Sequence, residues 1–127
     1  MKSYPFADIV LTGHSLGGVL AATVGSKLKL PTLVWNAPGT LYLQEVLGLD
    51  PTGIQRMVVN VVADEDFVPL TDVQQCVVQP IPCIGKGGVR LSGMMCHSML
   101  KTGCEIWRVC GDQKQRDFSE ACGRWVG

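Results

Sequence analysis

Three short apolar runs in the first half of the chain have the pattern of buried strands. They occupy residues 8–12, 32–36 and 57–63, and the third is the most strongly β-branched stretch of the sequence. Each run is almost continuously apolar rather than alternating, which is typical of strands covered on both faces in a parallel sheet. We therefore predict three parallel strands.

Helical periodicity separates these runs. Residues 16–29 carry larger side chains at helical spacing, together with alanines and glycines that permit close approach to a sheet. The stripe that we expect to face the sheet comprises Leu16, Val19, Leu20, Thr23, Val24 and Leu28. A second, short helix is expected at 41–47, closed by Gly48 and then by Pro51.

Strands alternating with helices predict an α/β fold with an open parallel sheet and right-handed crossovers. Functional sites in such sheets lie at the carboxyl ends of the strands. Ser15 follows the first predicted strand, and an acidic cluster at residues 64–66 follows the third. We expect both at the same edge of the sheet.

The pattern is less regular after Cys76. Residues 77–78 and 89–91 are expected to be short extended pieces, 86–88 a turn, and 117–122 about one and a half helical turns. The stretches 94–99 and 105–107 fall in what we predict to be a loop-rich region. The whole chain, 1–127, is predicted to be one domain with 76–127 as a Cys-rich subregion.

Composition is that of a globular protein, with 127 residues, 46% hydrophobic and 17% charged. Residues 1–75 carry four basic and seven acidic side chains, and residues 76–127 carry seven and four. An asymmetry this mild does not indicate nucleic-acid binding. No apolar run is long enough to span a bilayer, and the N-terminus lacks the pattern of a signal peptide.

All six cysteines lie in the last 52 residues: Cys76, Cys83, Cys96, Cys104, Cys110 and Cys122. An even number confined to a Gly- and Pro-rich region predicts two or three disulfides and an oxidising compartment, such as the extracellular space or a vacuolar or lysosomal lumen. Turn chemistry at 79–82 favours pairing Cys76 with Cys83. Reduced cysteines in a cytosolic protein are the alternative, whereas a zinc site is disfavoured because no C-x-x-C occurs.

The candidate chemistry begins at Gly13-His14-Ser15-Leu16-Gly17, a G-x-S-x-G pattern between a predicted strand and a predicted helix. In that context the pattern indicates a nucleophile elbow, in which Ser15 projects its hydroxyl from a strained turn. A side chain at Gly13 or Gly17 is expected to collide with the neighbouring strand or helix. The same is expected at Gly18. The alternative is a glycine-rich turn whose serine only caps the helix.

A nucleophilic serine needs a base and a carboxylate that orients the base. His14 adjoins Ser15 and points to the opposite side of the strand, which leaves His97 as the candidate base. Asp66 is the favoured carboxylate. The nearby acids Asp64, Glu65 and Asp72 remain alternatives.

Three segments resemble the core of the class 3 lipases, the fungal-lipase-like branch of the α/β hydrolases. They are residues 9–18, Leu30-Pro31 with Asn36-Ala37-Pro38-Gly39, and Asp66-Phe67-Val68-Pro69. The second segment is most similar to the vacuolar lipases that lyse autophagic bodies. His97-Ser98 followed by 105–107 is similar to the loop of the family's catalytic histidine.

The resemblance implies Ser15 as nucleophile, Asp66 as orienting acid, His97 as general base and the Leu16 N–H as one oxyanion donor. In the autophagic-body branch a Cys-His pair can precede the catalytic histidine, so Cys96-His97 could instead match that pair, with the base beyond Gly127. The family's second oxyanion donor and its lid lie upstream of the elbow. Because only 14 residues precede Ser15, we expect the C-terminal half of a lipase, with an unpaired sheet edge able to self-associate.

The function implied by the resemblance is a serine carboxylic ester hydrolase acting on acylglycerols or phospholipids at a lipid surface. It needs no metal or organic cofactor. Two alternatives remain: an inactive lipase-like fragment, or a non-catalytic module that binds lipid or a partner through Met94, Met95 and Met99.

Overall fold

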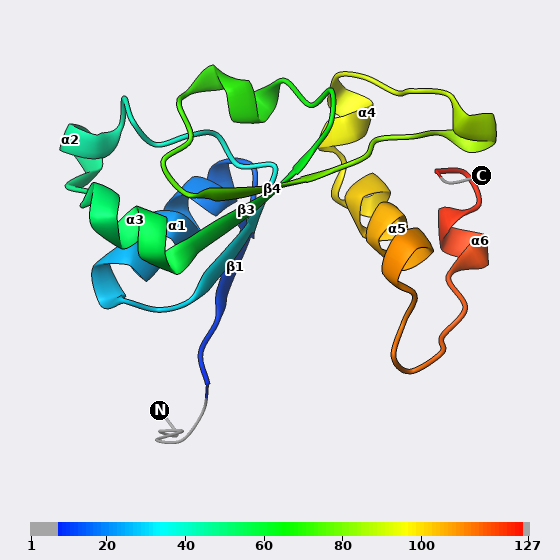
Figure 1. Cartoon of the computed structure of the whole chain (residues 1–127), viewed down its shortest axis with the longest axis horizontal. Coiled ribbons are helices and arrows are strands. Elements are labelled where there is room, and N and C mark those ends of the chain that lie inside the picture. Colours follow the sequence, from blue (N-terminus) through cyan, green and yellow to red (C-terminus); the bar gives the residue numbers. More distant parts are fainter. Residues whose placement is uncertain (1–7, 126–127) are drawn as a thin grey trace.

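A four-stranded parallel sheet forms the centre of the computed structural model, which describes residues 8–125. Its strands are β1 (Leu11–His14), β2 (Thr32–Trp35), β3 (Val58–Ala63) and β4 (Val77–Ile81), side by side in that order (Figure 1). The predicted partial α/β fold is thereby confirmed.

Two strands differ from the prediction. The first begins at Leu11 rather than residue 8 and continues to His14, because its pairing with β2 starts at Leu11 opposite Thr32. Residues 77–78 open a full strand, β4, which pairs in parallel with β3 from Val59 onward. The full length of β4 was not predicted because Pro80 lies within it and Pro82 follows it, and proline argues against a strand. An edge strand tolerates proline, however.

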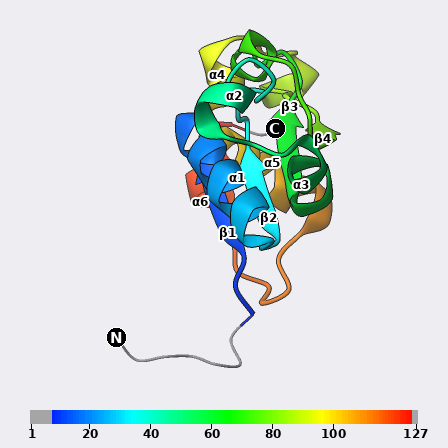
Figure 2. The same cartoon turned by 90° about the vertical axis from the view of Figure 1, so that its left-hand side faces the viewer.

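One face of the sheet is covered by α1 (Leu16–Leu28) and α3 (Pro51–Met57), and Figure 2 shows these helices in front of the strands. The buried apolar cluster between these layers comprises Ala22, Val34, Ala37, Leu49, Ile54 and Val58. The short α2 (Gln44–Leu47) ends at Gly48 in a left-handed conformation, near the predicted position. Pro51 does not close that helix but begins α3, where Asp50 caps the N–H groups of residues 52 and 53.

The packing face of α1 is the reverse of the predicted one. Of the expected stripe, only Val19 is buried, whereas Leu16, Leu20, Val24 and Leu28 are exposed. The small residues Gly18, Ala22, Gly25 and Ser26 face the sheet instead. Close approach of helix and strands selects small side chains, and this outweighs the helix's own amphipathic pattern.

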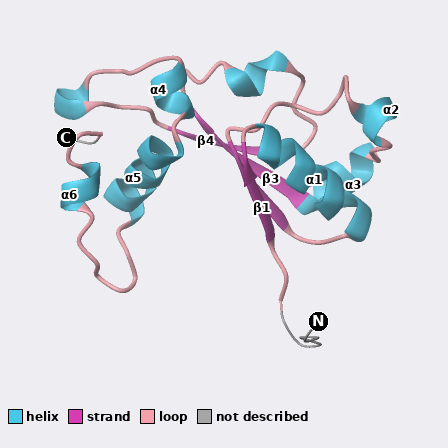
Figure 3. Ribbon diagram, turned by 180° about the vertical axis from the view of Figure 1, so that it is seen from behind, coloured by secondary structure: helices cyan, strands magenta, loops and turns pink. Residues whose placement is uncertain are grey.

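The C-terminal region contains α4 (Met94–His97), α5 (Met99–Cys110) and α6 (Ser119–Cys122), together with the 3-10 turns at Val68–Thr71 and Lys86–Gly88. Figure 3 shows α5 and α6 on the side of the sheet away from α1 and α3. The region expected to be loop-rich around residues 94–99 thus contains two helices, α4 and α5. The buried face of α5 carries Lys101, Thr102, Cys104 and Glu105, and because three of these four are polar, the face gives little apolar signal.

Two disulfides form, Cys83–Cys96 and Cys104–Cys122, while Cys76 and Cys110 are free. The predicted pairing of Cys76 with Cys83 was wrong because the two residues flank β4. Five strand residues at about 3.3 Å each hold them at opposite ends, too far for the Cα separation of a disulfide.

Two further observations concern the sheet edges and membrane insertion. Within residues 8–125, β1 and β4 are the edge strands of the sheet, so self-association through the β1 edge remains a prediction. None of the helices there is both long and apolar enough to cross a bilayer.

Candidate active site

Ser15 lies in the tight turn between β1 and α1. Its backbone has φ 56° and ψ −128°, a conformation that non-glycine residues rarely adopt. A Cβ on Gly13 would lie 2.2 Å from the Gly17 carbonyl oxygen, and one on Gly18 would lie 2.6 Å from the Cβ of Ala37. A Cβ on Gly17 would meet nothing within 4 Å, so the predicted collision there was wrong, because Gly17 lies on the exposed side of the turn.

Asp66 is buried in the turn that follows β3. Its Oδ1 accepts a hydrogen bond of 2.9 Å from the Val68 N–H, and its own N–H donates to the Ala63 carbonyl at 3.2 Å. These bonds fix the carboxylate and leave Oδ2 facing His97.

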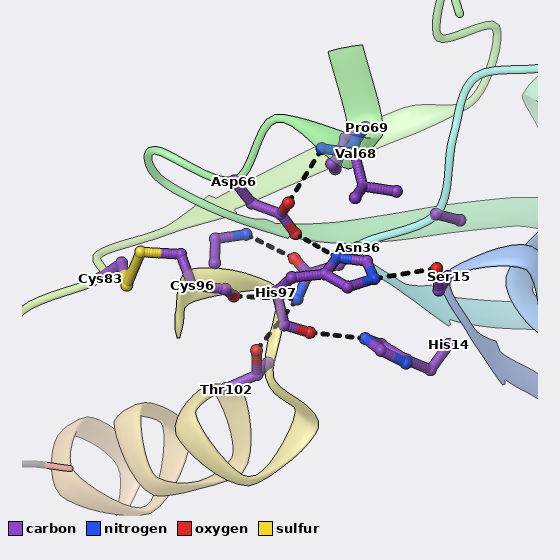
Figure 4. Close-up of polar contacts among 12 residues, drawn as sticks. His14, Ser15, Asn36, Asp66, Val68, Pro69, Cys83, Cys96, His97 and Thr102 are labelled. Carbon is purple, nitrogen blue, oxygen red and sulfur yellow. Dashed lines mark hydrogen bonds and ion pairs between the residues drawn. A yellow bond between two sulfur atoms is a disulfide. The ribbon is translucent and has the colours of Figure 1, made fainter. Parts of the chain in front are cut away.

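His97, the last residue of α4, lies between Ser15 and Asp66 and contacts both (Figure 4). Its Nδ1 lies 2.7 Å from Asp66 Oδ2, and its Nε2 lies 2.9 Å from Ser15 Oγ. A carboxylate only accepts hydrogen bonds, so we assign the imidazole proton to Nδ1, which leaves Nε2 to accept from the Ser15 hydroxyl. The structure thus brings together the three side chains that the sequence singles out.

The alternative acids lie elsewhere. The Glu65 carboxylate pairs with Arg90 at 2.7 Å on the surface. Asp64 borders a surface hollow with Arg90, and Asp72 accepts from the Tyr42 N–H at 3.1 Å. His97 therefore has Asp66 as its carboxylate partner.

Leu16, the remaining predicted site residue, is the first residue of α1. The first N–H groups of a helix have no acceptor within the helix and point outward from its positive end. The role of the Leu16 N–H as an oxyanion donor stays a prediction.

Asn36 supports the site and was missed by the sequence analysis. It is fully buried with φ 48°, and its Oδ1 accepts from the Ala63 N–H at 2.8 Å. Its Nδ2 donates to Thr102 Oγ1 at 3.1 Å and to the Cys96 carbonyl at 3.4 Å. One side chain therefore joins the strand before Asp66 to the segment of His97. An Asn that ends a strand, where a left-handed residue fits, was the available signal.

The His97 segment has further anchors. The Gly93 N–H donates to the Glu65 carbonyl at 3.0 Å, and Cys96 is tied by its disulfide to Cys83 beyond β4. His14 Nε2 lies 2.7 Å from the His97 carbonyl oxygen. His14 thus contacts the main chain of the candidate base rather than Ser15.

A buried ion pair of α5 binds the main chain of the segment that follows β4. Lys101 Nζ bonds the Glu105 carboxylate and the Ile84 carbonyl, and the same carboxylate accepts from Arg108. Burial acts to raise the pKa of Glu105, but the hydrogen bonds from Lys101 and Arg108 outweigh it, and the pKa lies below its usual value. No group of three or more metal-ligating side chains is found within residues 8–125.

Comparison with curated proteins finds similarity to fungal proteins named "Putative lipase ATG15". The chain is 47% identical to that of Vanderwaltozyma polyspora and 44% identical to that of Saccharomyces cerevisiae. Each match covers 55 residues, which is 42% of this chain and 10% or 11% of the relative. Identity to the Candida glabrata protein is 53% over 40 residues, which is 32% of this chain and 8% of the relative.

The matched segment thus spans about a tenth of the length of these relatives. The predicted resemblance to lipases of this type is confirmed. No family model matches the chain.

Proposed function

We propose that this chain carries the reactive-serine centre of a carboxylic ester hydrolase of the triacylglycerol lipase or phospholipase type. The observation that carries the proposal is the line of hydrogen bonds from Ser15 through His97 to Asp66. Similarity to proteins named as lipases supports it. The mechanism requires no metal and no organic cofactor.

Acylation begins when Ser15 Oγ attacks the ester carbonyl carbon and His97 Nε2 takes the hydroxyl proton. Asp66 accepts from Nδ1, keeps the ring oriented and stabilises the imidazolium. The Leu16 N–H donates to the oxyanion that develops on the carbonyl oxygen. The intermediate collapses, and His97 returns its proton to the departing alcohol.

Deacylation repeats the sequence with water. His97 removes a proton from water, and the hydroxide attacks the acyl carbonyl carbon. The intermediate collapses as His97 gives that proton to the departing Ser15 Oγ, which restores the hydroxyl and releases the carboxylic acid. His97 thus serves first as base and then as acid in each half of the reaction.

Exposed apolar residues next to each of the three side chains favour a lipid ester as the substrate. Leu16 follows Ser15, Phe67 follows Asp66, and Met94 and Met95 precede His97 in α4. Their exposed fractions are 68%, 50%, 63% and 49%. Exposed apolar side chains at these positions suit acyl chains, so we assign acylglycerols or phospholipids as the substrate class.

Two disulfides fit a compartment outside the cytosol. We propose that the protein is secreted or lies in a vacuolar or lysosomal lumen, and that it takes part in lipid degradation there.

A fluorophosphonate probe tests the proposal, because it reacts with a serine only when a base activates the hydroxyl. We expect the wild-type chain to be labelled and Ser15→Ala to remain unlabelled, with hydrolysis of a short-chain ester lost in parallel. Ser119→Ala, in α6 away from the site, is the matched control. Equal labelling of wild type and Ser15→Ala would refute the proposal.

A non-catalytic lipid-binding module is the second candidate, because Met94, Met95 and Met99 are exposed together on the adjoining helices α4 and α5. Binding to phosphatidylcholine vesicles that survives in Ser15→Ala, with no ester turnover by the wild type, would favour it. Turnover that disappears with Ser15 would instead favour the hydrolase.

A further inference from the structure

His97 occupies a junction where its main-chain carbonyl has no helical partner. Helix α4 ends at His97, Ser98 is extended with ψ 126°, and α5 begins at Met99. The Lys101 N–H, which would bond the His97 carbonyl in a continuous helix, turns to the Ser98 side chain instead. The carbonyl of the candidate base therefore needs a donor from another element.

His14 supplies that donor. Its Nε2 lies 2.7 Å from the His97 oxygen, and because a carbonyl only accepts, Nε2 must carry the proton. The two imidazole rings also contact each other, with centroids 4.6 Å apart and planes tilted by 38°. That separation is in the range of favourable aromatic pairs.

Two consecutive residues of the β1–α1 turn thus contact His97 in different ways. Figure 4 shows Ser15 bonded to the ring of His97 and His14 bonded to its main chain. The Ser15 contact is 2.9 Å long and spans 82 residues of sequence, and the His14 contact spans 83. Because His14 and Ser15 are adjacent in the chain, a displacement of the His97 main chain away from the serine would stretch or break the His14 bond.

We infer that His14 is a positioning residue, which fixes the distance between Ser15 Oγ and His97 Nε2 by donating its Nε2–H to the His97 carbonyl. The inference deepens the proposed function and rests on it for the kinetic part of its test. His14 takes no proton from the substrate or the serine; it acts only through the placement of His97.

Three substitutions separate the donor from the ring. His14→Gln keeps an N–H donor at similar reach without the ring, His14→Phe keeps the ring without the donor, and His14→Ala loses both. We expect the Ala and Phe variants to lose about 10- to 100-fold in kcat for ester hydrolysis with KM nearly unchanged, as for a misplaced catalytic group. His14→Gln should recover most of that loss.

A second measurement is independent of turnover. The proton on His97 Nδ1, held by Asp66, should give a low-field proton resonance in the NMR spectrum of the wild-type chain. We expect this resonance to persist in His14→Gln and to broaden by exchange in His14→Phe and His14→Ala. Circular dichroism and thermal unfolding of each variant report whether the fold is retained.

The two readouts distinguish the possible failures. An inactive wild type that shows the predicted NMR pattern would refute the hydrolase and leave His14 as the anchor of His97. An unchanged His97 resonance in folded His14→Phe would overturn the inference, as would a Gln variant no better in kcat than the Phe variant.

Discussion

Asn36 combines backbone strain with complete burial. Its positive φ has an energetic cost that only surrounding contacts offset, and its side-chain amide makes the three hydrogen bonds that join Ala63, Cys96 and Thr102. Strained residues with satisfied polar side chains concentrate where geometry has to be exact to fractions of an ångström. Here the elements so joined are those that carry Asp66 and His97.

Replacing Asn36 by Ala should destabilise the fold by about 2–4 kcal/mol, because buried donors and acceptors lose their partners while the strained backbone remains. Asn36→Gly removes the same side chain but accommodates the positive φ, so we expect it to be about 1 kcal/mol more stable than the Ala variant. Urea unfolding monitored by tryptophan fluorescence measures both. Equal stability of wild type and Asn36→Ala would show that the amide bonds contribute nothing.

Among the elements, the short α4 depends on its covalent tether. Four residues cannot form a stable helix alone, and the Cys83–Cys96 disulfide attaches this one to the end of β4, one residue before His97. The Cys104–Cys122 disulfide closes a loop of similar length between α5 and α6. The two bridges are therefore matched in chain entropy but differ in their distance from the site along the sequence.

Removing either disulfide by double Cys→Ala substitution should destabilise the chain by about 3 kcal/mol on the loop-entropy model. We expect only the loss of Cys83–Cys96 to slow fluorophosphonate labelling of Ser15, because only that bridge restrains His97. The measurement is the labelling rate of each double variant at a temperature well below its thermal unfolding midpoint. Equal slowing by both double variants would mean that stability alone governs reactivity.

Helix α5 contributes a pH-dependent interaction. The lowered pKa of Glu105 means that the folded state binds its proton less tightly than the unfolded state does. The resulting stability is fully present above the ordinary pKa, near 4.5, and is lost as the pH falls through the lowered value.

Lys101→Met removes one of the cations that pair with the buried Glu105 carboxylate. We expect it to lower the free energy of unfolding by about 3–5 kcal/mol at pH 7. The deficit in unfolding free energy should shrink towards pH 4, because without Lys101 the buried carboxyl group of the variant takes up a proton more readily than that of the wild type. Lys101→Met combined with Glu105→Leu removes both charges and should recover most of the loss. Urea unfolding of the wild type and both variants across this pH range is the measurement, and a pH-independent deficit would contradict the account.

The elements also show what could be predicted from sequence. Continuous apolar runs located β2 and β3, and larger side chains at helical spacing located α1. These signals failed for α5, whose buried face carries Lys101 and Glu105, and for the direction of α1, whose small residues pack inward. The pattern of apolar residues within one helix does not show which face of that helix packs against the sheet, because tertiary packing determines that face.

At the scale of the whole molecule, the parallel topology explains why the site could be anticipated. Carboxyl ends of parallel strands meet at one edge, so Ser15 after β1 and Asp66 after β3 had to lie near each other. Sequence pattern could mark Asn36 as a left-handed residue, but the hydrogen bonds of Asn36 and His14 to residues 96–102 could not be anticipated, because those residues lie in the Cys-rich region. The pairing of Cys83 with Cys96 sets the path of that region.

The most direct test of the central claim is the rate at which a fluorophosphonate modifies Ser15, with the adduct located by peptide mapping. The account predicts an adduct on Ser15 whose rate of formation falls by about 10³-fold or more in His97→Gln and in Asp66→Asn. It further predicts that the double variant is no slower than the slower single variant, since the groups act as one unit. An adduct on another serine, or a rate at Ser15 that is indifferent to His97, would contradict it.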